Sequence, residues 1–113
     1  MRAVVVDVAD LGPGQTRAVE AEGAKLLVCN AEGRFYAIEN RCPHARVRLD
    51  GAALHGCILE CPVHGGRLDV RDGSPQGYPI RRSALTYTVR PREGRIAIEI
   101  SSRIEREGTR CTT

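Results

Sequence analysis

Four residues with side chains that bind metals lie in two short motifs near the middle of the chain. The motifs are Cys42-x-His44 and, after sixteen intervening residues, Cys61-x-x-His64. Cysteine thiolates and histidine imidazoles are protein ligands for zinc and for iron. The spacing therefore predicts a metal centre held by Cys42, His44, Cys61 and His64.

The order of the ligands bears on which metal they bind. Two cysteines and two histidines can satisfy one tetrahedral zinc ion, but the usual zinc pattern places a Cys pair before a His pair. This chain supplies one of each in both motifs, which suits two inequivalent metals. In a Rieske-type 2Fe–2S cluster, two histidines replace two cysteines on one of the irons. Cys42 and Cys61 would then share one iron, and a zinc-binding module remains the alternative that metal analysis would exclude.

The residues beside the ligands predict stiff, tight loops. Pro43 and Pro62 each follow a ligand cysteine and fix φ near about −65°. Gly65 and Gly66 permit backbone conformations that bring main-chain N–H groups close to cluster sulfurs.

Short apolar runs bounded by Gly, Pro, Asn or Asp predict the strands that position these loops. The runs are Ala3–Val8, Arg17–Glu20, Lys25–Cys29, Phe35–Glu39, Cys57–Glu60, Arg67–Val70, Leu85–Arg90 and Arg95–Ile100. Strands with short connections favour an antiparallel sandwich or barrel over alternating strands and helices. We expect an all-β fold.

Length and composition limit the organisation and the class of protein. A chain of 113 residues predicts one domain, with a loop-rich cluster-binding subdomain at about 41–79 and a polar tail at about 101–113.

Five irregularly spaced cysteines argue against a disulfide framework. Scattered positive charges without interleaved aromatics argue against nucleic-acid binding. The chain has no apolar run of about 18 residues, and acidic Asp7 interrupts its start, so we expect a soluble, cytoplasmic protein. We also expect it to be a monomer.

Three stretches resemble Rieske-type ferredoxins, the small electron carriers of bacterial ring-hydroxylating oxygenase systems. They are FYAIENRCPHARVRLDG, CILECPVHGGRLDVRDG and YPIRRSALTYTVR, and the resemblance runs from about Val4 to Ile100. It implies a Rieske fold, a 2Fe–2S cluster on the four motif residues and no catalysis by the chain itself. It also implies one-electron transfer from a flavin-dependent, NAD(P)H-linked reductase to the terminal dioxygenase component of aromatic hydrocarbon catabolism.

The resemblance also implies where these partners dock and how the potential is set. Docking would be transient, at the tip formed by His44 and His64, with Pro43, Val63 and Pro79 as an apolar rim. High-potential relatives carry a disulfide between the loops, and here those positions are Arg46 and Val63. Their hydroxyl donors, a Ser and a Tyr, are replaced by Gly66 and Leu68. We therefore expect a potential near the lower end of the Rieske span, roughly −150 mV.

Several alternatives and bordering residues stay open. The same resemblance is compatible with the small subunit of an assimilatory nitrite reductase or with the ferredoxin of a multicomponent monooxygenase. His55 is expected to lie in a turn as a non-ligand, Cys29 and Cys57 to act as buried small hydrophobes, and Cys111 to be incidental. Arg46 and Arg48 would place positive charge beside the cluster. The segment 74–79 resembles the proline-containing loop that covers one side of the cluster in Rieske folds.

Overall fold

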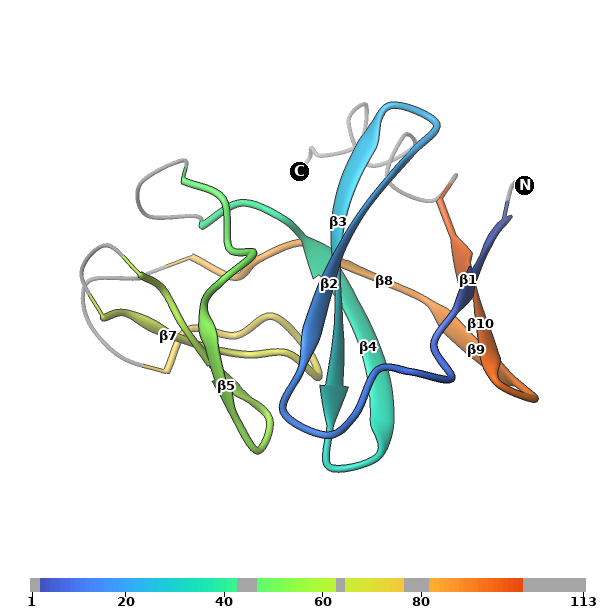
Figure 1. The fold of residues 1–113 in the computed structure, drawn as a ribbon. Coiled ribbons are helices and arrows are strands. Elements are labelled where there is room, and N and C mark those ends of the chain that lie inside the picture. The colour runs from blue at the N-terminus through green and yellow to red at the C-terminus, as the bar shows by residue number, and fades with distance from the viewer. Residues whose placement is uncertain (1–2, 43–46, 63–64, 77–81, 101–113) are drawn as a thin grey trace.

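The computed structural model describes residues 3–42, 47–62, 65–76 and 82–100, which form strands and no helix (Figure 1). The strands are β1 (Ala3–Asp7), β2 (Thr16–Ala21), β3 (Ala24–Ala31), β4 (Arg34–Glu39), β5 (Ala53–His55), β6 (Ile58–Glu60), β7 (Arg67–Asp69), β8 (Thr86–Tyr87), β9 (Val89–Arg92) and β10 (Arg95–Glu99). Every pairing between them is antiparallel. The expected all-β, antiparallel fold is confirmed, and the described residues contain no helix that could cross a membrane.

The strands form three sheets, and the middle sheet separates two hydrophobic cores. The sheets have the orders β1-β10-β9, β2-β3-β4-β8 and β5-β6-β7, with the four-stranded sheet in the centre (Figure 1). Because side chains alternate along a strand, Leu27 and Cys29 of β3 enter the core beside β5–β7. Leu26 and Val28 enter the core beside β1, β9 and β10. The first core contains both motif cysteines, so it forms the base of the predicted centre.

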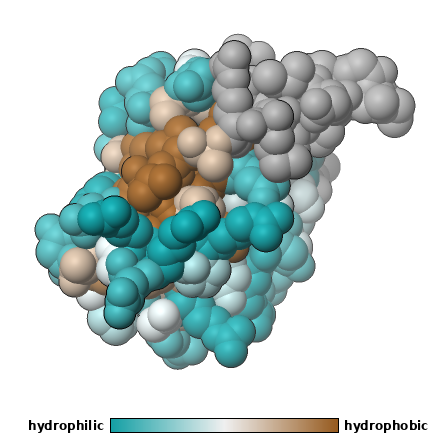
Figure 2. Space-filling view, turned by 90° about the vertical axis from the view of Figure 1, so that its right-hand side faces the viewer, coloured by the Kyte–Doolittle hydropathy of each residue, from teal (hydrophilic) through white to brown (hydrophobic). Residues whose placement is uncertain are grey.

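The outer sheet joins the two ends of the described chain. β1 pairs with β10 along its whole length, from Ala3 opposite Glu99 to Asp7 opposite Arg95. Figure 2 views this side of the molecule and shows an apolar patch framed by hydrophilic side chains. Val5 of β1 is the large hydrophobic side chain exposed here, at 57%. This face lies at the opposite end of the molecule from the motif loops.

Two elements differ from the expectation. The expected strand Leu85–Arg90 is divided at Thr88, because Tyr87 pairs with Ala37 in the central sheet whereas Val89 pairs with Ile98 in the outer sheet. β5 was not expected at all: its three residues, from a stretch without β-branched side chains, pair with β6. Both differences depend on a partner strand that lies elsewhere in the chain.

Candidate metal centre

Each motif cysteine begins a loop that is closed by the same main-chain hydrogen bond. The N–H of Cys42 donates to the carbonyl of Val47 at 2.8 Å, and the N–H of Cys61 donates to the carbonyl of Gly66 at 2.7 Å. Both bonds connect a cysteine to the fifth residue after it, so each encloses the histidine of its own motif. We call the segments 42–47 and 61–66 the first and second ligand loops.

The two cysteines lie at the buried base of these loops. Cys42 is 0% exposed and Cys61 is 2% exposed, and both belong to the core that also contains Leu49 and Leu68. Two sulfur ligands from separate loops, brought into one dry core, match the donor set that an iron–sulfur cluster requires. The described half of the site therefore fits a 2Fe–2S cluster at its cysteine-ligated iron.

Asn40 clamps the segment that leaves the first ligand loop. Its Oδ1 accepts the N–H groups of Leu49 and Asp50, at 2.6 and 3.0 Å, and its Nδ2 donates to Asp50 Oδ1 at 3.0 Å. The Asn40 N–H in turn donates to the carbonyl of Lys25 on the central sheet. Asn40 is buried, with 6% exposure. Through its main-chain N–H and its side chain, Asn40 thus connects the central sheet to the segment that follows the first ligand loop.

Arg48 extends this clamp outward. Its Nε and Nη2 donate to the two carboxylate oxygens of Asp50, at 2.9 and 3.1 Å. The Asn40 amide and the Arg48 guanidinium hold the pKa of the Asp50 carboxyl below its ordinary value. The positive charge expected at Arg48 is therefore balanced by a neighbouring carboxylate.

The second ligand loop is the turn of the β6–β7 hairpin. Glu60 and Arg67 form the last register pair before it, and Gly65 has a φ of 71°. The Gly65 N–H donates to the carbonyl of Cys61 at 3.1 Å, so this group closes the turn rather than pointing at a sulfur as we expected. Leu68 is fully buried in the core that contains both cysteines. The position that carries a tyrosine hydroxyl in high-potential relatives thus presents an apolar side chain here.

A polar network holds the far end of this hairpin. The Asp69 carboxylate accepts hydrogen bonds from the main-chain N–H, Nε and Nη2 of Arg71, which lower its pKa. Gly73, with a φ of 78°, packs so closely that a Cβ there would stand 2.2 Å from the Ala84 carbonyl oxygen. The Asp69 N–H donates to the Ser74 carbonyl, which begins a segment lying along β7.

The segment 74–76 is the described part of the expected covering loop. Pro75 forms a bridge with Leu68, and the Gln76 N–H donates to the carbonyl of Arg67 at 2.7 Å. This part of the loop therefore runs beside the strand that leaves the second ligand loop. Its continuation through Pro79 lies outside the described residues.

Other expected site residues also lie outside the described residues. They are His44, His64, Pro43, Arg46, Val63 and Cys111. Among the described residues, no group of three or more His, Cys, Asp or Glu side chains is arranged to hold a metal ion. The structure thus brings together Cys42 and Cys61 from the predicted set, and the histidines stay a prediction.

The remaining histidine and cysteines occupy separate places. His55 ends β5, its side chain is 71% exposed, and its Nε2 lies 3.8 Å from Glu60 Oε1. It is in a strand rather than the expected turn, at the other end of the β5–β6 hairpin from Cys61. Cys29 is fully buried, as expected, and burial raises the pKa of its thiol to about 12. Cys57 is half-buried, with its Sγ 4.0 Å from Asp69 Oδ2.

The first-loop clamp was not found from the sequence. Asn40 and Asp50 belong to no motif with an assigned chemistry, and they are ten residues apart. The available signal was a polar residue directly after the apolar strand pattern of Phe35–Glu39. That signal also fits an ordinary strand end.

Comparisons with known proteins agree with this geometry. The family model described as "Rieske [2Fe-2S] domain" matches residues 1–89. The ferredoxin component of the naphthalene 1,2-dioxygenase system of Pseudomonas putida is 34% identical over 96 residues, covering 85% of this chain and 92% of its own. The ferredoxin of carbazole 1,9a-dioxygenase from Nocardioides aromaticivorans IC177 has a TM-score of 0.81 and 33% identity, covering 87% of this chain and 97% of its own.

A second solved structure shows such a ferredoxin with its partner. It is a complex of reduced oxygenase and oxidized ferredoxin in carbazole 1,9a-dioxygenase. The matching chain has a TM-score of 0.80 and 34% identity, covering 85% of this chain and 100% of its own. The family match and the relatives of similar length agree with the buried cysteines in two loops that close in the same way. The chain is therefore a member of the Rieske [2Fe-2S] domain family, a ferredoxin with a Rieske-type cluster.

Proposed function

We propose that this ferredoxin takes single electrons from an NAD(P)H-linked, flavin-dependent reductase and passes them to a terminal ring-hydroxylating oxygenase. The observation that carries the proposal is the placement of Cys42 and Cys61 at the base of two equivalent loops on a fold shared with ferredoxin components of dioxygenase systems. The cluster supplies a reversible one-electron site when bound. The chain's own residues hold it and exclude water from its cysteine side.

The proposed ligands are Cys42 and Cys61 for the inner iron and His44 and His64 for the outer iron. The cysteines are supported by their burial in one core. The histidines are supported by position, because each falls inside the hydrogen bond that closes its loop. We further propose that partners dock transiently at the tip of these loops and that the ferredoxin acts as a monomer in the cytoplasm.

An EPR spectrum of the dithionite-reduced protein tests the cluster and its ligands. We expect the spectrum of mixed His/Cys ligation, which should be lost or altered in His44→Ala and His64→Ala. His55→Ala is the matched control, because His55 is exposed and belongs to neither ligand motif. An unchanged spectrum in both ligand variants, or a colourless and EPR-silent wild type, would contradict the assignment.

We also propose that the potential is low, near roughly −150 mV. Gly66 has no side chain, and Leu68 places an apolar group in the core around the cysteines. Without hydroxyl donors to sulfur, the more negative, reduced cluster is less stabilised. A redox titration measures the midpoint directly, and a value above about +100 mV, in the upper part of the Rieske span, refutes this proposal.

Purification from the native host separates this role from that of a permanent enzyme subunit. A shuttle should leave its partners during washing in moderate salt, since transient electron-transfer interfaces are small. Stoichiometric recovery of a reductase subunit with the tagged chain would support the nitrite reductase alternative instead.

A further inference from the structure

The net positive charge of this protein is concentrated in the part of the chain that carries the ligand loops. Residues 41–82 contain seven arginines and four acidic residues, which accounts for the whole net charge of +3. The rest of the chain is balanced. Positive residues are scattered along the sequence, but the acidic residues that would neutralise them are scarce between 41 and 82.

Part of this charge is neutralised internally, and part remains exposed. Arg48 is bound to Asp50, and Arg71 is bound to Asp69. Exposed Arg41, Arg67 and Arg82 form no ion pair with a carboxylate within the part of the chain that the structure describes. We call these three residues the arginine collar.

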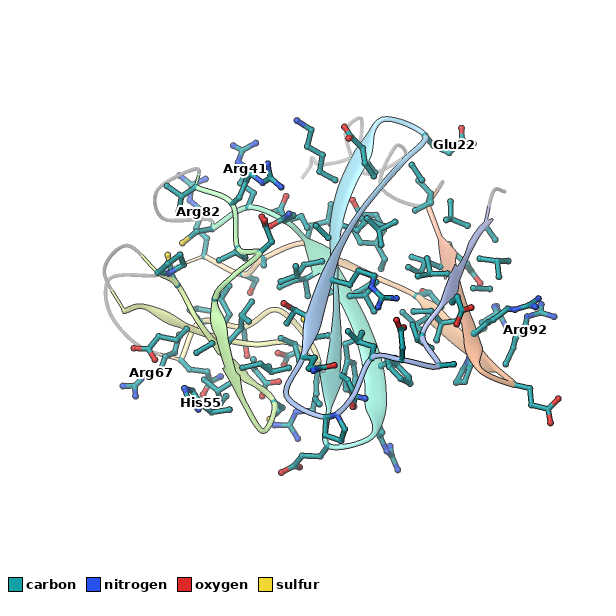
Figure 3. The ribbon with its side chains drawn as sticks, viewed as in Figure 1. Glu22, Arg41, His55, Arg67, Arg82 and Arg92 are labelled. Carbon is teal, nitrogen blue, oxygen red and sulfur yellow. The ribbon has the colours of Figure 1, made fainter. Side chains whose placement is uncertain are left out.

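Two of the collar residues adjoin the ligand loops in the sequence. Arg41 directly precedes Cys42, and Arg67 follows Gly66, which closes the second ligand loop. Figure 3 shows Arg41, Arg67 and Arg82 at one end of the molecule and Arg92 at the opposite end. Glu60 lies opposite Arg67 in the β6–β7 register and is the acidic residue nearest the collar along this hairpin.

We infer that the ligand-loop end of this ferredoxin docks on an acidic face of its protein partners. The inference rests on the proposed electron-transfer function and specifies the partner's chemistry. Complementary charge raises encounter rates and orients short-lived complexes. A nucleic acid fits less well, because Phe35, Tyr36 and Tyr87, the described aromatic side chains, are half-buried or buried, whereas stacking on bases needs exposed rings.

Stopped-flow oxidation by small charged reagents tests the collar on the holoprotein. One electron leaves the reduced protein and converts ferricyanide, an anion, to ferrocyanide, or cationic tris(phenanthroline)cobalt(III) to cobalt(II). Raising ionic strength from about 0.01 to 0.15 M shortens the Debye length from about 30 to about 8 Å. We expect the rate constant with ferricyanide to fall about tenfold and that with the cobalt complex to rise.

Matched variants locate the effect. Arg41→Gln and Arg92→Gln each remove one positive charge, at opposite ends of the molecule (Figure 3). Arg41→Gln should weaken the salt dependence, and Arg92→Gln should leave it close to wild type. A ferricyanide rate independent of salt, or an equal effect of both variants, overturns the inference.

Binding of poly-L-glutamate gives a readout that does not depend on electron transfer. Arg41→Gln should raise the dissociation constant by a factor of up to about five, the upper end of the range for one exposed ion pair, while Arg92→Gln should not. Equal binding by both variants overturns the collar even where the cluster behaves as proposed. Tighter binding of single-stranded DNA, lost in the same variant, would also overturn it.

Discussion

Replacing Asn40 by alanine should loosen the first ligand loop more than it destabilises the fold elsewhere. The substitution leaves the Leu49 N–H without its acceptor at 2.6 Å and removes two partly exposed hydrogen bonds with Asp50. An unsatisfied buried amide costs about 1–3 kcal/mol, and the other bonds contribute about 0.5–1.5 kcal/mol. A loss of about 2 kcal/mol would raise the population of the opened loop about 30-fold.

The assay is the rate at which iron passes to a chelator, followed by the visible absorbance of the cluster under native conditions. Asn30→Ala is the control, because buried Asn30 also bonds two main-chain groups, the Leu11 carbonyl and the Gly33 N–H, in a different part of the fold. Both variants should unfold at lower urea concentration, but iron release should accelerate in Asn40→Ala alone. Equal rates of iron release would refute the clamp.

An exchange of the two polar groups provides a rescue. Asn40→Asp alone brings two carboxylates into contact and should speed iron release. Adding Asp50→Asn restores one amide and one carboxylate, with an acceptor still facing the Leu49 and Asp50 N–H groups. The double variant should recover much of the wild-type retention and keep the wild-type EPR spectrum.

Three further predictions concern stability and reactivity. Gly73→Ala should cost at least about 3 kcal/mol of unfolding free energy, because its Cβ would meet a backbone oxygen at 2.2 Å. Gly33→Ala, with open space around the added Cβ, should cost about 1 kcal/mol, and urea titrations of the two variants compare these costs. Because Arg71 lowers the pKa of Asp69, this pair stabilises the fold above the carboxyl's ordinary pKa of 3.8 and loses that effect as pH falls below it. Asp69→Asn should therefore reduce the loss of unfolding free energy at acid pH, measured by urea titrations at a series of pH values. Burial and a pKa of about 12 should protect Cys29 from iodoacetamide at about pH 8, so peptide mass spectrometry that finds it alkylated in the folded protein would contradict its placement.

The site was predictable where one short motif carried the chemistry. Cys42 and Cys61 were identified from spacing alone, and their burial at the base of two loops agrees with that assignment. Asn40 was not identified, because its role depends on Asp50, and only the folded chain brings the two within hydrogen-bond distance. The local sequence identifies the metal ligands, whereas the side chains that hold the loop in place are identified only in the folded structure.

The strands, too, were predictable where their own residues carried the pattern and not where a distant partner strand decided the pairing. Runs such as Phe35–Glu39 were recognisable from their own pattern, and β4 covers Arg34–Glu39. The break at Thr88 was not recognisable, since Tyr87 and Val89 belong to different sheets and the apolar alternation continues through them. A pattern reports the conformation of a segment but not the sheet that it joins.

The pairing of β1 with β10 also affects the order in which the molecule can assemble. Ala3 must find Glu99, whereas β3–β4 and β6–β7 are hairpins between neighbouring segments. Contacts distant in sequence form more slowly than local ones. During synthesis, both hairpins and both ligand loops leave the ribosome before β10 does. The topology therefore favours assembly from the ligand end toward the outer sheet, so iron delivery need not wait for β1 to be covered.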